Sequence, residues 1–81
     1  MADKLYDIED IYIPTKRRST LDPAKVEELA DSILEEGLRL PIMVRSDGKR
    51  LILVEGLHRL EACRSLGEKT ILCMLVQARQ Q

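Results

Sequence analysis

The feature that most constrains the fold is an abrupt change of hydrophobic pattern at Gly56. The apolar run at Leu51–Val54 is typical of a β-strand, whereas the residues after Gly56 follow the spacing of a helix. A glycine at such a junction lets the backbone approach a ligand, and the free N–H groups of the first helical turn point outward. Because His58 and Arg59 can both carry positive charge, the junction predicts a phosphate-binding turn between a strand and a helix.

The same residues have a plainer interpretation, which the sequence leaves open. Gly56 can be an ordinary turn glycine, His58 a cap that packs on its neighbours, and Arg59 a solvated helix residue. Spacing alone favours neither interpretation.

Length and charge narrow the classes of protein to consider. The chain has 81 residues, which predicts a single domain over 1–81 with a modest core, so any active site is expected to be shallow and built from loops. Thirteen Lys and Arg against 14 Asp and Glu give a net charge of −1, so no overall positive field indicates nucleic-acid binding. With two tyrosines and no Phe or Trp, the chain lacks the aromatic platforms on which single-stranded nucleic acids stack.

The cysteines do not predict a metal site. Cys63 and Cys73 have no Cys-x-x-Cys spacing, and His58 is the one histidine of the sequence. Both thiols lie in apolar patterns, which favours small buried side chains over reactive thiols. The sequence shows neither a signal-peptide pattern nor a membrane-length apolar run, so we expect no membrane partner and a reducing cytoplasmic location.

The N-terminal part predicts a strand, a loop and a helix. Apolar residues recur over Leu5–Ile13, which favours a short strand ended by Pro14, and the basic stretch Thr15–Thr20 has no pattern and indicates a loop. Asp22 is a good N-cap for a helix that begins at Pro23. That helix is expected to end at Gly37. Its apolar positions are Val26, Leu29, Ala30, Ile33 and Leu34.

The remaining elements complete a mixed α/β pattern. Pro41–Arg45 and Leu51–Val54 are continuous apolar runs around the turn signal Ser46–Gly48, so they predict a hairpin with strands buried on both faces. A second helix is expected from close to His58 to Leu66, with Gly67 as its stop. Thr70–Val76 predicts the last strand, and Gln77–Gln81 a polar tail. The fold class is therefore α/β of the α+β type: a small mixed sheet with two main helices.

Several short motifs, in the same order along the chain, carry a resemblance to a known family. They cover about three quarters of the chain. The motifs are Arg18-x-x-x-Asp22, Lys25-x-x-Glu28-Leu29-Ala30-x-Ser32-Ile33, Gly37-Leu38, Pro41-Ile42-x-Val44, Gly56-x-x-Arg59-x-x-Ala62 and Leu66-Gly67-x-x-Thr70-Ile71. This order resembles the N-terminal domain of ParB partition proteins, whose fold includes the sulfiredoxins. The stretches Leu21–Val26 and Glu61–Cys63 are similar to the sulfiredoxin branch.

The chain departs from both branches at the same turn. Sulfiredoxins are ATP-dependent reductases, and the resemblance implies that their catalytic cysteine corresponds to Leu57 of this chain. A leucine side chain has no nucleophilic atom. Cys63 lies six residues further on, so we expect no sulfinic-acid reductase activity. The typical Gly-Glu-Arg-Arg box of ParB reads Gly56-Leu57-His58-Arg59 here, and the DNA-reading helices and dimer domain of full ParB proteins have no counterpart in this sequence.

The resemblance implies a set of ligand-binding residues. Gly56, His58 and Arg59 are expected to hold a nucleoside triphosphate, CTP or ATP, with or without Mg²⁺. Lys25 and Ser32 match nucleotide contacts of the sulfiredoxin branch, and Arg18 matches a basic loop residue of ParB that faces the same pocket. Because Lys25 and Ser32 are two helical turns apart, they lie along one face and can address one elongated ligand. A solvated surface role for either residue stays open.

Three functional hypotheses follow. The first is a nucleotide-phosphate-binding ParB-like domain, a DNA-associated partition-like or regulatory module in which Lys16, Arg17 and Arg18 contact DNA phosphates. The second is a ParB-like nuclease or phosphotransfer enzyme, for which Glu55 is the candidate base or Mg²⁺ ligand. The third is a sulfiredoxin-like protein without reductase activity, which binds a protein partner or forms part of a longer parent chain.

Overall fold

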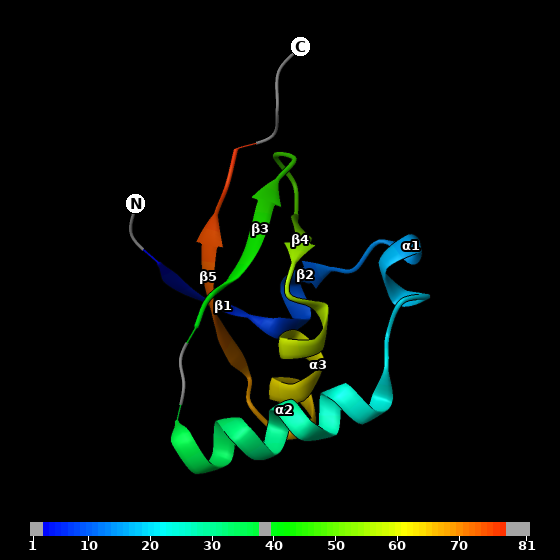
Figure 1. The fold of residues 1–81 in the computed structure, drawn as a ribbon. Helices are drawn as coiled ribbons and strands as arrows, with labels where there is room; N and C mark the ends of the chain where they lie inside the picture. Colours follow the sequence, from blue (N-terminus) through cyan, green and yellow to red (C-terminus); the bar gives the residue numbers. More distant parts are fainter. Residues whose placement is uncertain (1–2, 38–39, 78–81) are drawn as a thin grey trace.

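The strands of the computed structural model form one mixed sheet in the order β1-β5-β3-β4-β2 (Figure 1). Residues 3–37 and 40–77 are described. The elements are β1 (Lys4–Asp7), the 3₁₀ helix η1 (Ile8–Asp10), β2 (Ile11–Tyr12), α1 (Thr15–Arg18), α2 (Pro23–Glu36), β3 (Ile42–Ser46), β4 (Leu51–Glu55), α3 (Leu57–Ser65) and β5 (Thr70–Leu75). β1–β5 and β3–β4 are antiparallel, whereas β3–β5 and β2–β4 are parallel. The predicted fold class, a small mixed sheet with two main helices, is confirmed.

The prediction of one strand over Leu5–Ile13 is wrong. The segment forms two strands at opposite edges of the sheet, β1 beside β5 and β2 beside β4, with η1 between them. The turn forms because the Ile8 N–H donates to the Lys69 carbonyl at 2.9 Å and the Ile8 side chain is buried in the core. Contacts with distant residues therefore overrode the local β-propensity.

The loop predicted over Thr15–Thr20 is also wrong, because Thr15–Arg18 form the short helix α1. The Pro14 carbonyl accepts hydrogen bonds from the N–H groups of Arg17 and Arg18, and the hydroxyls of Ser19 and Thr20 donate back to carbonyls of the turn. None of the α1 residues is buried. A single turn without an apolar side to bury has no hydrophobic periodicity, so the sequence pattern could not reveal it.

The first main helix, α2, has the predicted ends. The Asp22 side chain accepts a hydrogen bond from the Ala24 N–H at 3.0 Å, and Pro23 occupies the first turn. Gly37 ends the helix in the left-handed region at φ 66°. Of its apolar positions only Ala30 is buried, and Leu34 is 70% exposed, so α2 is an outer helix.

The core lies between one face of the sheet and α3. Figure 1 shows α3 between the strands and α2, with α1 to one side near β2. The buried cluster consists of Ile8, Ile11, Ile13, Ile42, Val44, Leu53, Leu57, Leu60, Ile71 and Cys73. The prediction that both hairpin strands are buried on two faces fails for β3, since Met43 is 39% exposed. In β4, the adjacent residues Ile52 and Leu53 are both buried.

The second helix and the last strand follow their predicted ranges. α3 spans Leu57–Ser65, and β5 ends at Leu75. Cys73 is fully buried, and burial raises the pKa of its thiol to about 11, which agrees with the interpretation of a small core residue. Most of the predicted tail, residues 78–81, lies outside the described residues. None of the described helices is long and apolar enough to cross a membrane.

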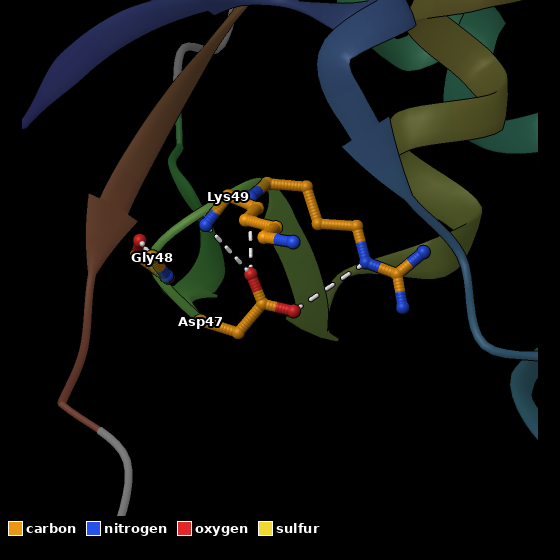
Figure 2. Close-up of polar contacts among 5 residues, drawn as sticks. Asp47, Gly48 and Lys49 are labelled. Atoms are coloured by element: carbon orange, nitrogen blue, oxygen red, sulfur yellow. Dashed lines mark hydrogen bonds and ion pairs between the residues drawn. The ribbon is translucent and has the colours of Figure 1, made fainter.

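The predicted hairpin turn is built around Asp47. Its Oδ1 accepts hydrogen bonds from the N–H groups of Lys49 and Arg50 at 3.0 Å, and its Oδ2 lies 3.5 Å from Arg50 Nε (Figure 2). The Arg50 guanidinium in turn lies 4.0 Å above the Tyr12 ring, which ties the hairpin to the edge strand β2. The backbone hydrogen bonds from Lys49 and Arg50 are the main causes that lower the pKa of Asp47.

We expect the Asp47→Ala variant to be less stable than the wild type at neutral pH, with a difference that disappears in acid. Because the pKa of Asp47 is lowered in the folded state, its contribution is present above the ordinary value of 3.8 and is lost as the pH falls through the lowered value. Urea unfolding midpoints across this range measure the effect. A difference that persists after Asp47 is protonated would show that the carboxylate charge is not involved.

Candidate functional site

The candidate site is centred on the first turn of α3. Gly56 is the N-cap residue, with φ 111°, and its carbonyl accepts the first helical hydrogen bond from the Leu60 N–H at 2.9 Å. Because glycine has no side chain with which to cap the helix, the N–H groups of the first turn are left for solvent or a ligand. This end of α3 carries partial positive charge and is suited to an anion.

Packing against β3 also requires a glycine at position 56. A Cβ atom built at this position would lie 2.6 Å from Ile42 Cγ2 and 2.8 Å from Ile42 Cβ, in the buried part of β3. The sequence left two interpretations of Gly56 open, close approach of a ligand and an ordinary turn. Its absent side chain is in fact required by packing of the β4–α3 junction against β3, whether or not a ligand binds.

Two open pockets adjoin at His58. The first, of about 410 Å³, is lined by Lys25, Glu28, Leu29, Ser32 and His58. The second, of about 360 Å³, is lined by Arg17, Thr20, Leu29, Glu55, Gly56, Leu57, His58 and Arg59. Since Leu29 and His58 belong to both, the two form one surface region. It brings together the predicted residues Lys25, Ser32, Glu55, Gly56, His58 and Arg59, which come from α2, α3 and the end of β4.

The charged side chains of this region are available to a ligand. It contains the cations Arg17, Lys25 and Arg59 against the carboxylates Glu28 and Glu55, a local balance of +1 where the whole chain carries −1. Within residues 3–37 and 40–77 the ion pairs are Asp47–Arg50 and Glu61–Arg64, so none of these five charges is paired there. Unpaired cations around a helix N-terminus are arranged to receive an anion.

His58 makes a contact that the sequence did not predict. Its Nε2 accepts a hydrogen bond from the Asp22 N–H at 3.0 Å, joining the start of α3 to the start of α2. An acceptor at Nε2 implies that the proton of the neutral ring is on Nδ1. No pattern in the sequence could indicate this pairing, because the two residues are 36 positions apart.

From the basic stretch Thr15–Thr20, Arg17 lines the surface region in place of the expected Arg18. Arg17 is half-buried and lines the second pocket, whereas Lys16 and Arg18 are exposed and line neither pocket. Arg18 was the residue that the sequence motif assigned to the nucleotide. The helical turn of α1 directs Arg17 to this position. To choose Arg17 over Arg18 from the sequence, one would have had to recognise that a helical turn begins at Pro14.

Two further candidates have distinct environments. Leu57 is 6% exposed and belongs to the core cluster, so the position that matches the sulfiredoxin nucleophile is held by an apolar core residue. Glu55 is exposed at the end of β4 and lines the second pocket. In the described parts of the chain, no cluster of three or more His, Cys, Asp or Glu could hold a metal ion, so Mg²⁺ here would need oxygen ligands from a bound phosphate.

Comparisons with known proteins match the chain to ParB proteins and to a sulfiredoxin. A model of the ParB N-terminal domain matches residues 4–81. A probable chromosome-partitioning protein ParB of Campylobacter jejuni is 40% identical over 62 residues, 76% of this chain and 22% of that protein. The sulfiredoxin of Arabidopsis thaliana is 40% identical over 68 residues, 84% of this chain and 54% of that protein. The chain thus spans about a fifth of the ParB relative and about half of the sulfiredoxin.

Solved structures agree with these matches. The crystal structure of Arabidopsis sulfiredoxin has a TM-score of 0.84 at 35% identity and covers 96% of this chain and 88% of its own. A C-terminally truncated ParB of Caulobacter crescentus, complexed with CTP-gamma-S, has a TM-score of 0.80 at 28% identity, covering 99% of this chain and 47% of its own. The same Caulobacter protein on its centromeric parS site has a TM-score of 0.76 at 27% identity, covering 95% of this chain and 42% of its own.

We expect Gly56→Ala to cost about 2–4 kcal/mol of unfolding free energy, since it adds a Cβ against Ile42 to the strain of a positive φ. Gly48→Ala is the matched control: Gly48 also has a positive φ, but a Cβ there meets nothing within 4 Å. It should cost about 1–2 kcal/mol. Equal losses in chemical denaturation would contradict a packing role for Gly56.

Proposed function

Because the chain belongs to the family of ParB N-terminal domains, we propose that it binds a nucleoside triphosphate, CTP or ATP, with the phosphates at the N-terminus of α3. In this proposal it is the nucleotide-binding module of a DNA-associated partition-like or regulatory protein. The observation that carries the proposal is the convergence of Arg17, Lys25 and Arg59, all without ion-pair partners in the described structure, on one uncapped helix start.

In the proposed site, the groups contact different parts of the nucleotide. The first-turn N–H groups of α3 donate to a phosphate, and Arg59 supplies a planar fork that matches two of its oxygens. Arg17 approaches the same pocket from α1. Lys25 and Ser32 line the adjoining pocket from α2, so a ligand longer than a single phosphate reaches both. A triphosphate joined to a nucleoside has that length.

The identity of the ligand draws support from the relatives. The Caulobacter ParB in the comparison is complexed with CTP-gamma-S at 28% identity to this chain. The carboxylates Glu28 and Glu55 line the region beside the cations. Mg²⁺ typically binds one or two carboxylates together with substrate phosphates, so either residue is suited to a metal-bound nucleotide.

A phosphotransfer or nuclease activity is the second candidate. It is favoured by the exposed carboxylate of Glu55, which lies next to Gly56 and lines the pocket proposed for the phosphates. A general base or a metal ligand needs such a position. Nucleotide hydrolysis that is lost in Glu55→Gln while binding is retained would support this candidate.

For the proposed nucleotide site, Arg59→Ala should weaken binding of CTP or ATP by about ten- to a hundredfold, since a charge-assisted bidentate contact is worth about 1.5–3 kcal/mol. Calorimetric titration with and without Mg²⁺ measures the change. Arg64→Ala is the matched control, because Arg64 lies on the same helix outside both pockets and pairs with Glu61. The proposal fails if the wild type binds no nucleoside triphosphate at millimolar concentration.

If duplex DNA is a partner, Lys16, Arg17 and Arg18 should contact phosphates, and binding should fall steeply with salt. Three such contacts give a slope of about −2.7 for log affinity against log salt. Replacing all three with alanine should remove most of that slope without unfolding the domain, because no residue of α1 is buried. Alanine at the exposed Lys4, Lys49 and Lys69 changes the net charge equally and is the control. Unchanged affinity and slope in the α1 variant would exclude this segment.

A further inference from the structure

Thr20 lies on the wall of the pocket proposed for the phosphates. It is exposed, and it lines the second pocket together with Arg17, Gly56 and Arg59. The Thr20 hydroxyl donates a hydrogen bond to the Arg17 carbonyl at 2.7 Å. An accessible hydroxyl therefore stands beside the cations and the uncapped helix start that the proposed nucleotide site uses.

The residues around Thr20 form a pattern that protein kinases recognise. Arg17 and Arg18 stand three and two positions before the threonine, and Leu21 directly follows it. Kinases that prefer basic substrates bind arginines at those two positions through carboxylates of their own and place the next side chain in an apolar site. Leu21 is 38% exposed, so it is accessible to such a site. The segment is thus suited to phosphorylation at Thr20.

The segment can open to enter a kinase without unfolding the core. Protein kinases bind their substrates in an extended form, so the turn of α1 has to open first. None of the α1 residues is buried, and the N–H groups of Thr20 and Leu21 donate to the nearby carbonyls of Arg17 and Arg18. A turn without buried apolar surface opens at low free energy. Thr20 is therefore accessible in the folded domain.

We propose that Thr20 is a phosphorylation site whose phosphate occupies the anion site at the start of α3 and excludes the nucleotide, a proposal that rests on the proposed nucleotide site. A protein kinase transfers the γ-phosphoryl group of ATP to Thr20. The bond between the γ-phosphorus and the ADP oxygen breaks, a bond from this phosphorus to Thr20 Oγ1 forms, and the hydroxyl proton passes to the catalytic carboxylate of the kinase. The modified chain then carries its own anion at the site.

The charges in the second pocket favour a phosphate on Thr20. A phosphothreonine carries about −1.5 to −2 charges at pH 7 and has three acceptor oxygens. Arg17 and Arg59 line the same pocket and supply guanidinium donors, and the first-turn N–H groups of α3 supply more. Among the described residues of this lining, Glu55 is the one carboxylate that opposes the phosphate. The ester also loses the hydroxyl proton that binds the Arg17 carbonyl, so the side chain can turn toward the pocket.

A phosphate on Thr20 competes with the nucleotide because it is attached next to the pocket. A short connection gives it an effective concentration of about millimolar order, and its charge repels an incoming triphosphate. Ser19 offers a matched comparison. Its hydroxyl donates to the Lys16 carbonyl, and Ser19 lines neither pocket. A phosphate on Ser19 adds the same charge one residue away without occupying the site.

Phosphate transfer tests the modification site. The catalytic subunit of cyclic-AMP-dependent protein kinase, which prefers basic substrates, should transfer about one phosphate per chain from ATP, and mass spectrometry should locate it at Thr20. Thr20→Ala and Arg18→Ala should each lower the rate about tenfold or more. Lys49→Ala, which removes an exposed cation far from the pattern in sequence, should leave the rate unchanged. Transfer to Ser19, or no transfer at all, overturns the assignment of Thr20.

Binding to chemically defined proteins tests the regulation. The 81-residue chain can be synthesised with phosphothreonine at position 20 or phosphoserine at position 19, by joining two peptides at the Ala62–Cys63 bond. In calorimetry with CTP and ATP, the phosphate on Thr20 should weaken binding about tenfold or more, and the phosphate on Ser19 by less than about threefold. Without nucleotide, amide hydrogen exchange in the first turn of α3 should be slower with the phosphate on Thr20 than in the unmodified chain.

The outcomes separate the regulation from the site itself. Nucleotide affinity that the phosphate on Thr20 leaves unchanged, or that both phosphates lower equally, overturns the regulation and leaves the nucleotide site standing. Unchanged amide exchange in the first turn of α3 also overturns it, because the phosphate then does not occupy the anion site. If the unmodified chain binds no nucleoside triphosphate, the proposed function itself is overturned.

Discussion

The contact between Gly56 and Ile42 is the constraint on which the candidate site depends. At φ 111° the chain leaves β4 and enters α3 with no room for a side chain above Ile42. Directly beyond this point Leu57 and Leu60 enter the core. The start of α3 is thereby fixed relative to the sheet, and the direction in which its free N–H groups point is set by packing rather than by any ligand.

The helices that form the surface region around that helix start differ in how many apolar residues they bury. The base of this region belongs to α3, which is anchored by buried apolar residues. Its sides come from α1 and α2, and among the described residues of these two helices only Ala30 is buried. Elements with little buried apolar surface open at lower free energy than the core. The first turn of α3 therefore has a fixed geometry, whereas the parts of the surface region that come from α1 and α2 can shift at lower free energy.

The sequence predicted the parts of the fold whose signals are local. Asp22, Pro23 and Gly37 set the ends of α2 through their own backbone preferences, and Gly56 marks the start of α3. The break between β1 and β2 depends on the Lys69 carbonyl, and the bond between Asp22 and His58 joins residues 36 positions apart. Such contacts are made in the folded chain alone, so periodicity could not reveal them. That Arg17 rather than Arg18 lines the pocket was hidden for a related reason, because α1 has no apolar pattern that would reveal its helical turn.

The order of strands in the sheet has a consequence for how the chain folds. β1, at residues 4–7, pairs with β5, at residues 70–75, and β2 pairs with β4, so the first twelve residues supply both edges of the described sheet. Within this sequence β1 is synthesised before its partner strand β5, with more than sixty residues between them. Closing such long loops slows folding, and an unpaired strand is open to wrong partners in the meantime. Completion of the sheet therefore has to wait until residues 70–75 have been synthesised, whatever has already formed around α3.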